Sequence, residues 1–98
     1  MPKQAILCVD DEAIIVIAMK QELKGHFGHA YYIDTALSAQ EAFNKIDEMV
    51  ENGIELVAII SDWLMPGMKG DEFLSIIHEK YPHVVSILVT GQADADAI

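Results

Sequence analysis

The chain has little of several residue types. Its 98 residues include no arginine, one cysteine, three prolines and six glycines. The small numbers of proline and glycine and the hydrophobic fraction of 52% indicate a folded and not a disordered chain. Cys8 cannot form an internal disulfide, and its apolar neighbours predict a packed, inert thiol. No apolar run approaches about 18 residues and no signal-peptide pattern is present, so we expect no membrane span and a cytoplasmic protein.

The charge is strongly one-sided. Six lysines stand against 16 acidic residues, which gives a formal net charge of −10. A nucleic-acid duplex or an anionic membrane would repel this field, so we expect no direct binding to either. Carboxylates that lie close together favour Mg²⁺ or Ca²⁺. Much of the charge is equally consistent with ordinary surface, which is our interpretation of Asp47, Glu48, Glu51 and Glu55.

Four short apolar runs alternate with segments of helical spacing. The runs cover residues 5–9, 30–33, 56–60 and 84–89. Continuous runs rich in isoleucine and valine are typical of strands covered on both faces, as in a parallel sheet. The length allows one domain.

The first helix is expected over residues 12–24, ending at Gly25. The third covers roughly 71–80, and Pro82 prevents its continuation. A fourth could begin near Gln92. The apolar positions at helical spacing in the first and third are Ile14, Ile17, Ala18, Phe73, Ile76 and Ile77.

The second helix is expected over residues 38–52. Ser38 with Glu41 three residues later forms a capping box, and Gly53 is a plausible stop. One face of this helix carries Ala39, Ala42, Phe43, Ile46 and Val50. With right-handed crossovers, the alternation of strands and helices predicts an α/β fold with an open, doubly wound parallel sheet.

Three acidic residues fall at strand ends: Asp10 and Asp11 after the first, Asp62 after the third. If these strands are neighbours, the carboxylates converge in the crevice where such sheets bind ligands. Two charges about 5 Å apart repel by roughly 3 kcal/mol at an effective dielectric near 20. The cluster would therefore raise its own pKa values or bind a cation, and Mg²⁺ fits best. The alternative for Asp10 and Asp11 is capping of the following helix.

Three motifs together resemble a known family. They are VDDE at residues 9–12, SDWLMPGMKG at 61–70 and LVTG at 88–91. In this order and spacing they are similar to the receiver domain of two-component response regulators, the CheY-like, flavodoxin-like fold. The resemblance covers nearly the whole chain.

The resemblance implies a phosphoacceptor signalling domain that switches a downstream output. Asp62 would take a phosphoryl group from a sensor histidine kinase or a histidine phosphotransfer protein. Thr90 would donate its hydroxyl to a phosphoryl oxygen, with the Gly91 N–H nearby. Such a domain is not an enzyme and assists only its own phosphorylation and dephosphorylation.

The resemblance also implies a Mg²⁺ site. Asp11 would bind the ion directly, Asp10 largely through water, and Asp62 would supply a further ligand. The backbone carbonyl of Leu64 would complete the protein's share of the coordination.

The loop after Asp62 contains Pro66, Gly67 and Gly70. Proline fixes φ and glycine allows positive φ, so these residues are expected to shape the loop. In doing so they would aim the carbonyl of Leu64 at the metal.

The sequence departs from the family at its end. A receiver has five βα units, with a lysine and an aromatic switch residue on the fifth strand, but nothing follows Ile98. We therefore expect residues 1–98 to be a receiver domain truncated after the fourth strand, lacking the fifth strand and last helix. Mg²⁺ binding should persist, phosphorylation should be slow, and the output domain lies outside this chain. An uncovered edge at residues 84–89 would favour a dimer or swapped oligomer, or marginal stability.

Two other functions are compatible with parts of the pattern. An aspartate-nucleophile phosphatase would need an aspartate where Leu64 stands. A phosphorylation-independent, receiver-like dimerisation or interaction module would need no metal, so failure to bind Mg²⁺ would favour it.

Overall fold

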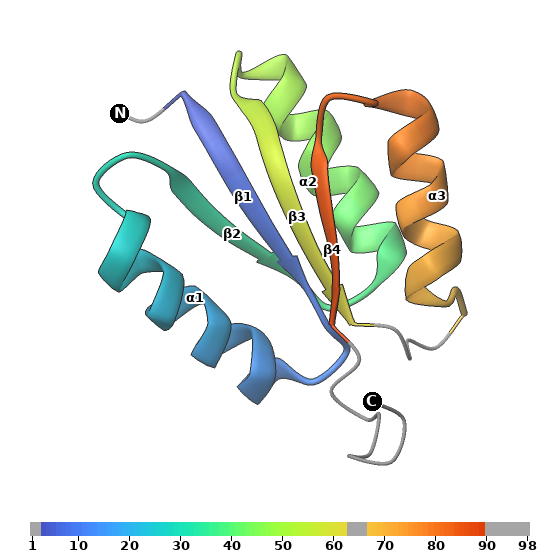
Figure 1. The fold of residues 1–98 in the computed structure, drawn as a ribbon, viewed down its shortest axis with the longest axis horizontal. Helices are drawn as coiled ribbons and strands as arrows, with labels where there is room; N and C mark the ends of the chain where they lie inside the picture. Colours follow the sequence, from blue (N-terminus) through green and yellow to red (C-terminus); the bar gives the residue numbers. More distant parts are fainter. Residues whose placement is uncertain (1–2, 63–66, 90–98) are drawn as a thin grey trace.

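The computed structural model describes residues 3–62 and 67–89. These residues form a parallel sheet in the order β2-β1-β3-β4, with helices on both faces (Figure 1). This confirms the open, doubly wound α/β architecture. The elements are β1 (Gln4–Val9), α1 (Ala13–Phe27), β2 (Tyr32–Ala36), α2 (Ala39–Glu51), β3 (Glu55–Asp62), α3 (Gly70–Lys80) and β4 (Val85–Val89).

The central strand β1 is covered on both faces. Its odd-numbered residues, such as Leu7, belong to the core under α2 and α3, whereas Ile6 and Cys8 belong to the core under α1. Because successive side chains of a strand point to opposite faces, a strand buried on both sides reads as a continuous apolar run. On the α2–α3 side, Phe43 and Phe73 lie with their ring centroids 5.2 Å apart.

Helix α1 is longer than expected and uses a different face. It passes through Gly25 and ends at Phe27. Val16 is buried and Met19 and Leu23 pack against the core, a spacing of three and seven residues that forms one stripe. The apolar positions Ile14, Ile17 and Ala18 do not form the buried face, and the first two are 80% and 54% exposed.

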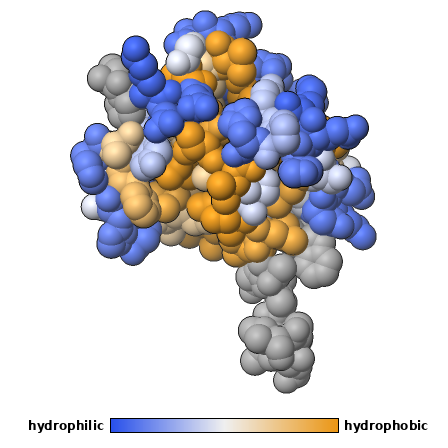
Figure 2. Space-filling model, turned by 45° about the horizontal axis from the view of Figure 1, so that its top comes forward, coloured by the Kyte–Doolittle hydropathy of each residue, from blue (hydrophilic) through white to orange (hydrophobic). Residues whose placement is uncertain are grey.

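Exposed apolar side chains gather on α1 and on β4. Figure 2 shows hydrophobic residues in the middle of the visible face, with hydrophilic residues above them and on both sides. The largest exposed apolar residues of these two elements are Ile14, Ile15, Ile17, Phe27, Val85, Ile87, Leu88 and Val89. Within the described part of the chain these side chains remain between 38% and 80% exposed.

Strand β2 begins two residues later than expected. The backbone N–H groups of Ala30 and Tyr31 donate to the carbonyl of Phe27 at 3.0 and 2.9 Å, so this segment closes a turn after α1. The strand instead includes Asp34 and Thr35. The apolar run at 30–33 was misleading because an edge strand tolerates polar residues that a central strand excludes.

Helix α2 begins as expected. The Ser38 Oγ accepts the backbone N–H of Glu41 at 3.0 Å, and Gly53 adopts a φ of +72° after the helix. The buried stripe includes Met49, whereas Val50, expected on that face, is 59% exposed.

The remaining elements differ from expectation by one or two residues. Strand β3 includes Asp62 as its last residue, and α3 begins at Gly70. Strand β4 begins at Val85. The helix expected near Gln92 lies outside the described residues.

Candidate functional site

The first and third strands are neighbours, as the convergence of the acidic residues required. β1 and β3 pair in parallel with Val9 opposite Ser61. Within the sheet, β2 lies on one side of β1 and β3 lies on the other side. The order of the strands therefore reverses direction at β1. The carboxyl ends of β1 and β3 therefore flank the switch point in strand order, where open α/β sheets bind ligands.

Three carboxylates meet at this switch point. One oxygen from each of Asp10, Asp11 and Asp62 lies within 4.8 Å of the other two. Asp10 is buried, Asp62 is half-buried and Asp11 is exposed. Within residues 3–62 and 67–89, no other three acidic, histidine or cysteine side chains come together in this way. The structure thus brings together the three strand-end aspartates of the sequence analysis.

Asp10 is fixed from two directions. Its backbone N–H donates to the Ala36 carbonyl at 3.1 Å, and its Oδ1 accepts the Glu12 N–H at 2.9 Å. Glu12 is the N-cap of α1, so this hydrogen bond fixes the residue that immediately precedes the helix. The capping alternative is therefore wrong for Asp10 and Asp11, because Glu12 is the N-cap and α1 has no side-chain capping hydrogen bond. Asp10 instead fixes the backbone two residues later in the chain and belongs to the cluster.

A buried serine adjoins the cluster and was not singled out from the sequence. The Ser61 Oγ donates to the backbone carbonyl of Asp62 at 3.0 Å. The side chain is fully buried. The available signal was a lone hydroxyl in an apolar run immediately before Asp62, since a buried hydroxyl requires a hydrogen-bond partner.

The electrostatics of the site disfavour an ionised Asp10. Burial raises the pKa of its carboxyl, the hydrogen bond from the Glu12 N–H lowers it, and the carboxylates of Asp62 and Asp11 raise it again. The pKa ends above its ordinary value. A divalent cation would reverse this, because opposite charge favours the ionised form. Three carboxylates at the carboxyl ends of neighbouring strands fit Mg²⁺, which binds few protein ligands and retains several waters.

Some of the expected site residues lie outside the described residues: Leu64, Pro66, Thr90 and Gly91. In the loop after Asp62, Gly67 has the expected positive φ, at +86°. The same expectation was wrong for Gly70, which is the first residue of α3. A helical residue has negative φ, so Gly70 needs no positive φ.

One feature away from the cluster agrees with the sequence analysis. Cys8 is fully buried, and burial, followed by the charge of Asp34, raises the pKa of its thiol to about 11. A thiol held protonated in the core is unreactive. Within the described part of the chain, no helix is long and apolar enough to cross a membrane.

Comparisons with known proteins agree with this geometry. Residues 6–98 match the family model described as the response regulator receiver domain. The chain is 33% identical over 97 residues to the hydrogenase transcriptional regulatory protein HoxA of Cupriavidus necator, covering 98% of this chain and 18% of HoxA. It is 34% identical over 98 residues to the transcriptional regulatory protein YvrH of Bacillus subtilis, covering 100% of this chain and 38% of YvrH. The chain therefore spans less than two fifths of the length of these relatives.

Solved structures give the same result. The signal receiver domain of an HD domain-containing protein from Pseudomonas fluorescens has a TM-score of 0.76 at 28% identity, covering 99% of this chain and 70% of that one. The beryllofluoride-activated NtrC4 receiver domain dimer has a TM-score of 0.75 at 33% identity, covering 97% and 71%. On its sequence, its fold and its strand-end aspartates, the chain belongs to the response regulator receiver domain family.

Proposed function

We propose that this chain is a phosphoacceptor domain in which Asp62 receives a phosphoryl group from a sensor histidine kinase or a histidine phosphotransfer protein. The observation that supports this proposal is the meeting of Asp10, Asp11 and Asp62 within 4.8 Å at the switch point of the sheet. Phosphoryl transfer depends mainly on positioning and on neutralising charge, and such a cluster with a divalent cation supplies both.

We propose Asp62 as the nucleophile, and it is more accessible for this role than Asp10. Asp10 is buried and one of its oxygens already accepts the Glu12 N–H. Asp62 is half-buried at the end of β3, and Ser61 holds its backbone carbonyl. An Asp62 carboxylate oxygen would attack the phosphorus of the donor's phosphohistidine. The new P–O bond forms an acyl phosphate as the P–N bond breaks, and the imidazole leaves with the bonding electrons.

The cofactor we propose is Mg²⁺. The carboxylates of Asp10, Asp11 and Asp62 would hold it together with the backbone carbonyl of Leu64. When bound, the ion neutralises the carboxylates and the phosphoryl oxygens. Asp10 would contribute mainly through water, because its carboxylate is already fixed by the hydrogen bond from Glu12.

The phosphoryl group would have further contacts outside the described residues. We propose that the Thr90 hydroxyl donates to a phosphoryl oxygen and that the Gly91 N–H lies nearby. A charge-assisted hydrogen bond of this kind is worth roughly 1.5–3 kcal/mol, enough to bias a two-state loop.

The partners follow from the proposed role. The curated relatives are named as transcriptional regulatory proteins and are much longer than this chain, so we propose that an output domain outside these 98 residues is switched. The phosphodonor and this domain would meet in the cytoplasm. A receiver domain 33% identical to this chain is described as beryllofluoride-activated, which makes beryllofluoride a useful probe here.

The test is incubation of the 98-residue chain with acetyl phosphate and Mg²⁺, followed by intact mass. We expect a gain of one phosphoryl group that EDTA prevents and Asp62→Asn abolishes. Asp47→Asn, at an exposed position of α2, changes the net charge equally and should keep the gain. A phosphoryl group that persists in Asp62→Asn would show that the nucleophile is wrongly assigned.

The rate and the metal dependence separate two further expectations. The 98 residues used in this assay have no lysine after Lys80, so we expect transfer to them to be slow, and brisk stoichiometric acylation would contradict that. If the chain neither gains mass nor binds Mg²⁺ at millimolar concentration, the phosphorylation-independent interaction module becomes the better interpretation.

A further inference from the structure

Strand β2 is an outer strand of the sheet, and its backbone groups alternate between its neighbour and the free edge. The Ala36 carbonyl accepts the Asp10 N–H, so the backbone groups of Ala36 face β1. In a parallel pair, residues two apart face the same way. Asp34 therefore also faces β1, whereas the N–H groups of Ile33 and Thr35 face the free edge.

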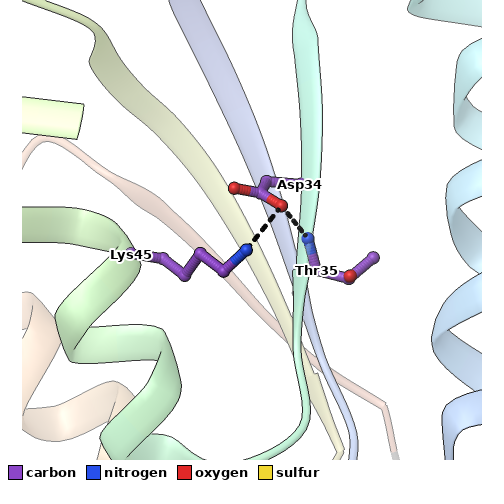
Figure 3. A network of polar contacts seen from close by, with 3 residues as sticks. All are labelled: Asp34, Thr35 and Lys45. Carbon is purple, nitrogen blue, oxygen red and sulfur yellow. Dashed lines mark hydrogen bonds and ion pairs between the residues drawn. The ribbon is translucent and has the colours of Figure 1, made fainter. Parts of the chain in front are cut away.

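One of these free-edge donors is already occupied. The Asp34 Oδ1 accepts the Thr35 N–H at 2.8 Å (Figure 3). A strand joining the sheet at β2 would need this N–H for its own ladder. The carboxylate thus takes the place that a carbonyl of the incoming strand would occupy.

Lysine 45 holds this carboxylate in position. The Lys45 Nζ reaches from α2 to the same Asp34 oxygen at 3.3 Å, as Figure 3 shows. The two side chains are 32% and 14% exposed, respectively. Burial lowers the pKa of Lys45, but the charge and the hydrogen bond of Asp34, together with the charges of Glu41 and Tyr32, raise it further than burial lowers it, so the pKa ends above its ordinary value. The Lys45 side chain is therefore charged at neutral pH.

The surface beside this pair would otherwise favour an added strand. A groove of about 640 Å³ opens between β2 and α2, and Met49 and Ile54 provide apolar contact in it. The opposite edge has no comparable charged side chain. Every residue of β4 is exposed, and its sequence is VSILV.

We propose that Asp34, held by Lys45, closes the β2 edge so that a second copy of this chain cannot add a strand there. Charged residues that point inward at an edge strand are a known way of preventing edge-to-edge pairing. In this chain the Asp34 carboxylate acts by accepting the Thr35 N–H and not only by repulsion.

The direct test is amide hydrogen exchange measured by NMR on the 98-residue chain. The Thr35 N–H should exchange about tenfold or more slowly than the Ile33 N–H on the same edge, because a hydrogen bond to a carboxylate must first open. Asp34→Ala should abolish this ratio. Asp34→Asn keeps an oxygen that can accept the Thr35 N–H, so it should retain most of this ratio. This variant therefore separates the effect of the hydrogen bond from the effect of the negative charge. The ratio within one molecule is insensitive to a loss of overall stability.

The consequence for assembly is measured with a concentration series. In Asp34→Ala, the amide signals of residues 32–36 should shift with protein concentration, and in the unaltered chain and in Asp47→Ala they should not. The proposal is overturned if Thr35 exchanges as fast as Ile33 in the unaltered chain. It is also overturned if Asp34→Ala leaves the ratio unchanged, or if its β2 signals do not depend on concentration. If Asp34→Ala does not fold, the unaltered chain and Asp34→Asn still decide the exchange ratio.

Discussion

Replacing Asp10 with asparagine should make the metal-free protein more stable. Asparagine retains an oxygen that can accept the Glu12 N–H, so the contact at the start of α1 survives. The change removes a negative charge from the most buried of the three carboxylates. Repulsion from Asp11 and Asp62 is then relieved.

The size of the effect follows from the separation of the charges. At 4.8 Å, two unit charges repel by about 3.5 kcal/mol at an effective dielectric near 20 and by about 0.9 kcal/mol in bulk water. Water reaches Asp11 and, in part, Asp62, so the true value lies toward the lower figure. We expect a gain of about 1–2 kcal/mol in the free energy of unfolding, or roughly 4–16 °C in Tm for a domain of this size.

The assay is thermal or urea unfolding with EDTA and again with Mg²⁺. At a Mg²⁺ concentration ten times its dissociation constant, the unaltered chain should gain about 1.4 kcal/mol. Asp10→Asn should gain clearly less, because one member of the cluster has lost its charge. Asp47→Asn, on the exposed side of α2, serves as the control for net charge and should respond to Mg²⁺ like the unaltered chain.

The opposite pattern would refute this reasoning. If Asp10→Asn is less stable than the unaltered chain in EDTA and its response to Mg²⁺ is undiminished, the three carboxylates do not repel one another appreciably. Asp10 would then not be a member of the cation site.

Three further predictions concern pH, association and the cap of α2. Because the folded pKa of Asp10 lies above its unfolded value, the folded chain keeps a proton that the unfolded chain has released. Asp10 therefore lowers metal-free stability as pH rises from the unfolded to the folded pKa, and urea titrations of Asp10→Asn should show a smaller fall. The 98-residue chain should form a dimer or larger oligomer in size-exclusion chromatography with light scattering, and Ile87→Lys on β4 should reduce its mass; a stable monomer of the unaltered chain would contradict this. Ser38→Ala should lower the free energy of unfolding by about 1 kcal/mol through loss of the cap to Glu41, whereas Ser75→Ala on the exposed side of α3 should change it little in the same urea experiment.

Features that depend on residues close together in the chain could be predicted from the sequence, whereas features that depend on distant segments could not. The capping contact of Ser38 depends on residues three apart, and it was predicted correctly. The continuous apolar run of β1 follows from burial on both faces, so it too could be read directly. The end of α1 and the start of β2 could not be predicted. The turn between them is set by backbone hydrogen bonds to the Phe27 carbonyl, and β2 lies at the edge of the sheet, where polar residues are tolerated.

The face that α1 buries also depended on the tertiary structure. Ile14, Ile17 and Val16 are similar in apolar character, yet only Val16 is buried. Helical spacing allows more than one stripe in so apolar a helix, and the position of the sheet selects one of them. Met49 replaced Val50 in the buried stripe of α2 for the same reason.

The candidate site shows the same division. The sequence by itself determined that three aspartates stand at the ends of apolar strands, because this is a matter of residue type and order. Only the tertiary structure decided that β1 and β3 are neighbours, that Asp10 accepts the Glu12 N–H, and that Asp34 reaches the Thr35 N–H at the free edge of the sheet. Strand order and the reach of side chains depend on packing between distant segments, and no local pattern encodes that.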